Sequence, residues 1–156
     1  MRYISYLIIL VVFHSCSRTE VDKLQIKLGE NRIDLAENLK YCIVIPTVGC
    51  GGCIDEGMSF LKRNQKLLDK HRSEVWIVFT SIISKKMLRL SMKDIDLPKS
   101  MIYYDVNNAY SAALEQSIYP SVLYLDNGNL QRLEFQSPEH SYTFTELEKI
   151  LKSDEL

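Results

Sequence analysis

The sequence lacks an excess of positive charge. Its 156 residues include 19 Lys and Arg against 20 Asp and Glu, which gives a formal net charge of -1 at pH 7. Proteins that bind nucleic acid depend on Lys and Arg for the phosphate contacts that dominate their affinity. We therefore set nucleic acid aside as a partner.

The sequence also lacks an apolar run long enough to cross a bilayer. The apolar stretch from Tyr3 to Phe13 is well short of the roughly 20 residues that a membrane-spanning helix needs. Arg2 precedes it, and Ser15 and Cys16 follow it, which is the pattern of an export signal rather than of a permanent transmembrane helix.

The end of this stretch, "HSCS", resembles the lipobox of bacterial lipoproteins. In such proteins the cysteine is lipidated and becomes the first residue. The resemblance implies a signal peptide at 1–15, lipid on Cys16, a tether at 16–22 and a domain at 23–156 in the cell envelope, facing the periplasm from the inner or outer membrane. A cleaved signal with Cys16 as an incidental thiol is the alternative.

The remainder reads as one globular domain, since no repeat or low-complexity segment interrupts it and 46% of the chain is hydrophobic. Hydrophobic patterning predicts strands at 23–28, 39–46, 74–81 and 101–105, helices at 54–71, 84–95, 107–117 and 143–153, the last capped by Thr143 or Thr145, and a hairpin at 120–136 turning at Asn127-Gly128. This order predicts an α/β fold, with a mixed sheet whose parallel portion is followed by a C-terminal antiparallel hairpin, flanked by helices.

Two cysteines, Cys50 and Cys53, follow the predicted strand at 39–46 and begin the next helix. The free N–H groups and the positive end of the helix dipole favour a thiolate there, so we expect Cys50 to be the nucleophile. Cys53, one helical turn further in, is close enough for a disulfide and is the expected resolving thiol. In an oxidising periplasm such a pair persists as a disulfide.

The cysteine pair has two other possible uses, a metal site and a structural disulfide. A metal site needs a second half, and Cys42, His71 and His140 lack ligand spacing to any other candidate, so no metal or other cofactor is expected. A structural disulfide without turnover remains open. Cys42 itself lies in a buried strand and is expected to be a small core residue.

The strand-CxxC-helix unit, Tyr119-Pro120 at the start of a later strand and the "LDNG" turn together resemble the thioredoxin-like superfamily, most closely its TlpA and AhpC/TSA-like envelope lipoproteins. The resemblance covers about Leu39 to the C-terminus. It implies a cis proline at Pro120 beside the disulfide, with Tyr119 and Pro120 contacting substrate. It also implies thiol-disulfide exchange with protein substrates and an envelope redox partner.

Several positions depart from thioredoxins. Val44 replaces the buried carboxylate that precedes the cysteine motif, and Gly49 replaces a tryptophan found in many relatives. Glycines also stand between the two cysteines, where proline or another side chain is usual. These departures argue against fast general reductase activity. Asp55 and Glu56, which follow Cys53, are expected to be solvated acids of the first helical turns, although like-charge repulsion of the thiolate is the alternative.

A second resemblance is to the TxxC motif of peroxiredoxins, because Thr47 stands three residues before Cys50. That resemblance implies a thiol peroxidase with an essential arginine, for which Arg132 is the only late candidate.

Four tyrosines are expected to lie in the core and at its rim rather than to form a binding stripe. They are Tyr103, Tyr104, Tyr110 and Tyr124.

The leading interpretation is a lipid-anchored thiol-disulfide oxidoreductase that acts through Cys50 and Cys53. A non-catalytic binding module braced by the same disulfide is the rival from another class.

Overall fold

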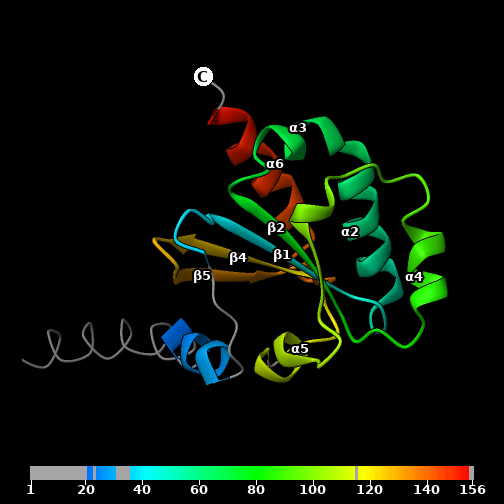
Figure 1. Cartoon of the computed structure of the whole chain (residues 1–156), viewed down its shortest axis with the longest axis horizontal. Coiled ribbons are helices and arrows are strands. Elements are labelled where there is room, and N and C mark those ends of the chain that lie inside the picture. The colour runs from blue at the N-terminus through cyan, green and yellow to red at the C-terminus, as the bar shows by residue number, and fades with distance from the viewer. Residues whose placement is uncertain (1–20, 23, 31–35, 115, 155–156) are drawn as a thin grey trace, which may run out of the picture.

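The computed structural model describes residues 21–22, 24–30, 36–114 and 116–154 (Figure 1). The strands are β1 (Tyr41–Pro46), β2 (Val75–Thr80), β3 (Ile102–Tyr104), β4 (Ser121–Asp126) and β5 (Asn129–Phe135), and the helices are α2 (Gly51–Arg63), α3 (Gln65–Lys70), α4 (Lys85–Ser91), α5 (Ala109–Ala113), α6 (Thr143–Ser153) and one 3₁₀ turn, η1 (Lys99–Met101). Residues 24–30 are also helical.

The five strands form one mixed sheet in the order β3-β2-β1-β4-β5. β1 pairs in parallel with β2, and β2 with β3, whereas β4 runs antiparallel to β1 and to β5. All six residues of β1 are buried, as expected for a central strand covered on both faces. The predicted α/β mixed sheet, with its parallel portion and C-terminal antiparallel hairpin, is confirmed.

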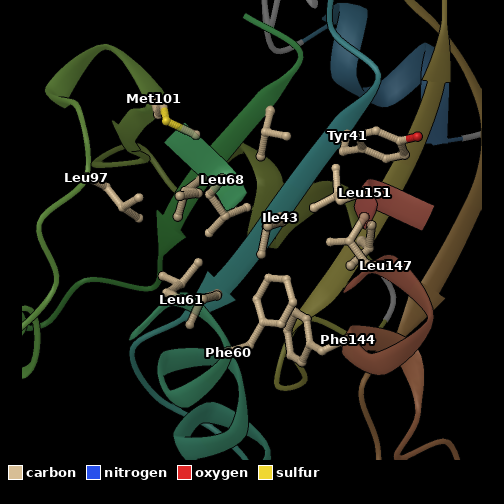
Figure 2. Close-up of a cluster of buried hydrophobic side chains, with 14 of the residues drawn as sticks. Tyr41, Ile43, Phe60, Leu61, Leu68, Leu97, Met101, Phe144, Leu147 and Leu151 are labelled. Atoms are coloured by element: carbon tan, nitrogen blue, oxygen red, sulfur yellow. The ribbon is translucent and has the colours of Figure 1, made fainter. Parts of the chain in front are cut away.

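Each face of the sheet packs against its own hydrophobic cluster. Ile43 and Ile45 of β1 face a cluster that contains Phe60 of α2, Leu68 of α3 and Phe144 of α6 (Figure 2). The intervening residues of β1, Cys42 and Val44, face a second cluster made with α5 and with the helical residues 24–30. Alternate side chains of a strand point to opposite faces, so β1 joins the two clusters.

The hairpin turns where the sequence predicts it. Asn127 and Gly128 have φ angles of 49° and 75°. Two successive positive φ angles characterise the two-residue turn that matches the twist of antiparallel strands, and Asn-Gly is the pair best suited to it.

Residues 23–28 were predicted to form a strand, and that prediction is wrong. Leu24 and Leu28 are buried, whereas Ile26 is 60% exposed. A strand would place all three side chains on one face, but in a helix only residues three or four apart share a face. The last two residues assigned to the tether, 21 and 22, are helical as well.

The single helix predicted over 54–71 is two helices that meet at Asn64. The buried Asn64 side chain donates to the Phe60 carbonyl oxygen at 3.2 Å and to the Glu148 carboxylate of α6 at 3.3 Å. Such a side-chain bond to the preceding turn competes with regular helix geometry.

The predicted threonine cap of α6 is also wrong. The N-cap residue is Tyr142, whose side chain makes no capping bond, and the Phe144 N–H in the first turn donates to the Gln136 side-chain oxygen at 3.4 Å. The Thr143 hydroxyl donates instead to the Phe135 carbonyl oxygen at 3.1 Å. It therefore ties the start of α6 to the end of β5.

A buried carboxylate, not singled out in the sequence analysis, links the parallel part of the sheet to α5. Asp105, directly after β3, accepts hydrogen bonds from the Thr80 hydroxyl at 2.9 Å and from the backbone N–H groups of Ala109 and Tyr110 at 2.8 and 2.9 Å. It connects the end of β2 to the first turn of α5, and these bonds offset the cost of burying it.

The predicted signal peptide and Cys16 lie outside the described residues. Within the described ranges, no helix combines the length and the apolar character that crossing a membrane requires.

Candidate redox site

The cysteine pair lies at the junction of β1 and α2. β1 ends at Pro46, and α2 begins at Gly51 with Cys50 as its N-cap residue, in extended conformation with φ -68° and ψ 98°. No side chain caps this helix, so the first turn presents its N–H groups beside Cys50. The placement predicted from the sequence is confirmed.

Cys50 and Cys53 form a disulfide, with their Cα atoms 5.3 Å apart. Cys50 is half-buried, whereas Cys53 is only 8% exposed. The N–H of Ile54 donates to the Cys50 carbonyl oxygen at 2.9 Å and closes the first helical turn around the pair. A partner approaching from solvent therefore meets Cys50 first.

Gly49 allows the backbone of Ile118 to lie directly against the loop that carries Cys50. Its φ of +149° is rarely adopted by residues with a side chain, and a Cβ atom there would overlap the carbonyl oxygen of Ile118 and lie 2.9 Å from its Cα. Beside this contact, the Cys50 N–H donates to the Ile118 carbonyl oxygen at 3.1 Å. Glycine is thus the residue that this close approach requires at position 49.

The prediction of a cis bond at Pro120 is wrong, because the described residues contain no cis peptide bond. Pro120 is buried, and its carbonyl oxygen accepts from the Gln136 N–H at 2.8 Å, which extends the β4–β5 ladder. A trans bond is the ordinary state of a proline at a strand start. The backbone contact with the cysteine loop is made two residues earlier, by Ile118, while Tyr119 is half-buried and donates its N–H to the Gln116 carbonyl oxygen.

The acids near the motif do not converge on the sulfurs. Asp55 is exposed, and the Glu56 carboxylate pairs with Arg63 at 2.9 Å. Val44 is buried on the face opposite to α2. In the part of the chain that the structure describes, no group of three His, Cys, Asp or Glu side chains could hold a metal ion.

Thr47 and Arg132 are not brought together. The Thr47 hydroxyl donates to the Ser81 carbonyl oxygen at 2.6 Å, which joins the loops that follow β1 and β2. Arg132 pairs in register with Tyr124, which itself lies opposite Tyr41 at the start of β1. At about 3.3 Å per residue, that level of the sheet is about 16 Å from Pro46, where β1 ends. Arg132 instead binds Glu134 and Glu146, both at 2.9 Å.

Cys42 is a core residue, as predicted. Its side chain is fully buried, and burial raises the pKa of its thiol to about 12 despite a hydrogen bond from Tyr110. Tyr110 and Tyr124 are likewise buried, whereas Tyr103 and Tyr104 are about half exposed, which matches the expected core and rim.

We expect the Cys42 thiol to be inert in the folded protein. In a Cys16→Ser variant of the oxidised full chain, a thiol reagent such as DTNB at pH 8 should find no rapidly reacting group, because the reactive thiolate form of Cys42 is suppressed and inaccessible. After unfolding in guanidinium chloride the same sample should release one equivalent. Rapid labelling before unfolding would contradict the buried position.

Comparisons with known proteins return structural neighbours only. No protein-family model matches the chain, and no curated protein matches it significantly. The chain is similar to a solution structure of a candidate thioredoxin from Neisseria meningitidis, with 19% identity, a TM-score of 0.47, and coverage of 74% of this chain and 76% of that one. It is also similar to a crystal structure of a thioredoxin-like protein from Parabacteroides distasonis, with 12% identity, a TM-score of 0.47, and coverage of 76% and 85%.

Proposed function

We propose that this protein is a thioredoxin-like thiol-disulfide oxidoreductase, anchored by lipid on Cys16 in a bacterial cell envelope. The observation that carries the proposal is the Cys50–Cys53 disulfide at the start of α2, with one cysteine accessible and the other shielded. This asymmetry suits exchange, which needs one sulfur that meets the substrate and one that resolves the adduct.

The reduced protein acts in two steps. The Cys50 thiolate, favoured by the N–H groups at the start of α2, attacks one sulfur of a substrate disulfide, forms a mixed disulfide and expels the other substrate sulfur as a thiolate. The Cys53 thiolate then attacks the Cys50 sulfur and releases the second substrate thiol. Two electrons pass to the substrate, and an envelope redox partner restores or removes them. The oxidised protein runs the same steps in reverse. Ile118 and Tyr119 are the substrate-facing residues in this proposal, whereas Pro120, which the thioredoxin resemblance also assigned to substrate binding, is buried.

Replacing Cys53 with serine should trap the intermediate. Without a resolving thiol, Cys50 remains joined to its substrate, so envelope extracts should accumulate adducts that dithiothreitol removes and non-reducing gels display. A Cys50→Ser variant, in which the shielded sulfur alone remains, is the matched control and should form few adducts. Equal adduct levels in the two variants would contradict the assigned roles.

The reduction potential separates exchange from a purely structural disulfide. We expect equilibration with glutathione buffers to give a value between about -120 and -270 mV, the range of exchanging pairs. A value below about -300 mV would instead identify the rival, a binding module braced by a stable disulfide.

Peroxidase chemistry is not favoured, because the Thr47 hydroxyl is bonded to Ser81 and Arg132 lies toward the other end of the sheet.

A further inference from the structure

An apolar groove runs beside the cysteine loop, between α2 and α4. It has a volume of 340 Å³ and is lined in part by Thr47, Val48, Ile54, Met58, Ile83 and Met87. Figure 1 shows α4 alongside the first half of α2, on the face of the sheet that also holds α6. The groove is distinct from the contact between Gly49 and Ile118, which approaches Cys50 from the β4 segment.

Nothing in the described chain covers the apolar rim of this groove. Ile83 is 82% exposed, Met87 63% and Val48 48%. No charged side chain lines the groove. A contiguous apolar surface of this kind, next to a reactive group, is characteristic of an interaction site.

The surface of α4 that faces away from the groove is basic, and two of its cations, Lys85 and Arg89, line a separate hollow with Tyr104 and Val106. From Ser84 to Lys93 the chain carries four cations and no acid, and these cations are Lys85, Lys86, Arg89 and Lys93. All four are exposed, and within the described residues none of them forms an ion pair. An occupant that fills the groove with apolar side chains and extends over α4, where it places carboxylates near the cations, would match both features.

Residues on both sides of Cys50 in the sequence line the groove. Thr47 and Val48 precede Cys50 by three and two residues, and Ile54, whose N–H bonds to the Cys50 carbonyl oxygen, follows it by four. A stretch of three residues spans at most about 10 Å. A polypeptide whose cysteine reacts at Cys50 can therefore place its neighbouring side chains in the groove.

We propose that the groove between α2 and α4 binds an extended segment of the redox partner in which apolar and acidic residues flank the reacting cysteine. This inference rests on the proposed exchange function and specifies its substrate class. A flat anionic membrane would also attract the cations, but a concave hollow lined by residues on both sides of Cys50 fits a polypeptide better than a bilayer surface.

The test uses three synthetic nine-residue peptides, each with a central cysteine joined to glutathione. The residues that flank the cysteine are leucine and aspartate, leucine and lysine, or serine and glycine. Cys50 of the reduced full chain attacks the peptide sulfur and expels glutathione, and Cys53 then releases the peptide thiol. The leucine-aspartate peptide should react about tenfold faster than the other two, the discrimination that a small apolar or charged contact supplies.

Two isoleucines provide a matched pair of variants. Ile83→Ser should remove most of the preference for the leucine-aspartate peptide, whereas Ile26→Ser, at a 60% exposed position on the opposite face, should retain it. A double variant, Lys85→Glu with Lys86→Glu, should shift the preference toward the leucine-lysine peptide. In all variants, the rate with oxidised glutathione should stay within about twofold of the original, because that small disulfide does not reach the groove.

The outcomes separate the two proposals. Equal rates for the three peptides, or an unchanged preference in Ile83→Ser, would overturn the groove proposal while leaving exchange intact. Failure to react even with oxidised glutathione would overturn the exchange function itself. Binding to phosphatidylglycerol vesicles that requires Ile83, without any peptide preference, would show that the surface faces a membrane and would also overturn the groove proposal.

Discussion

Replacing Gly49 with alanine should lower the free energy of unfolding by about 2–6 kcal/mol, the sum of backbone strain and overpacking. The added Cβ would overlap the Ile118 carbonyl oxygen, and the φ of +149° is unfavourable for alanine. Because the opposing atoms belong to the backbone, they cannot move aside as the end of a flexible side chain can. Urea unfolding followed by circular dichroism, with the disulfide intact, measures the effect.

Gly52 is the matched control for this substitution. It lies three residues further on, in the first turn of α2, with no atom within 4 Å of a Cβ built on it and no positive φ. Alanine there should stabilise the protein by about 0.4–1 kcal/mol by restricting the unfolded chain. A Gly49→Ala protein as stable as the Gly52→Ala protein would contradict the close approach of Ile118.

The second large effect is expected at Phe144. Its ring, 2% exposed, stacks on Phe60 with centroids 4.9 Å apart and 20° between the planes (Figure 2). A Cβ built on Gly57 would lie 3.4 Å from the same ring, so Phe144 packs directly against α2. Phe144→Ala should cost about 3–5 kcal/mol, from lost burial and the cavity left behind.

Two further variants keep this prediction testable if Phe144→Ala does not fold. Phe144→Leu, which preserves more of the volume, should cost about 1.5 kcal/mol or less. Tyr142→Ala removes an aromatic ring two residues earlier, at a 56% exposed position, and should change stability by less than about 0.5 kcal/mol. Guanidinium chloride unfolding of the oxidised proteins measures all three. Similar losses for Phe144→Ala and Tyr142→Ala would contradict the packing of α6 on α2.

The elements predicted correctly are those with a strong local signal. β1 and β2 are continuous apolar runs, and the hairpin turn has the Asn-Gly pair that its backbone geometry favours. Cys50 and Cys53 could be placed because a helix start fixes both the exposure and the spacing of its first residues. For these residues local chemistry and tertiary structure agree.

The errors arise where the local signal fits two structures or is absent. Leu24 and Leu28 suit one face of a strand as well as one face of a helix, and only their packing against the second cluster decides. The role of Ile118 could not be predicted because its contact with Cys50 is made by a backbone carbonyl, which every residue has. Gly49 was the one available signal, since a glycine before a motif can mark a close approach of two backbones.

The main chain and the side chain at position 118 have separate roles, so the side chain there can vary. Position 118 holds Cys50 through its main chain alone, while its isoleucine side chain is 52% exposed beside the disulfide. Natural or laboratory selection can therefore exchange that side chain, and with it the surface beside Cys50, without moving the Cys50 sulfur. The main chain at position 118 fixes the place of Cys50, and the side chain at the same position sets the surface beside it.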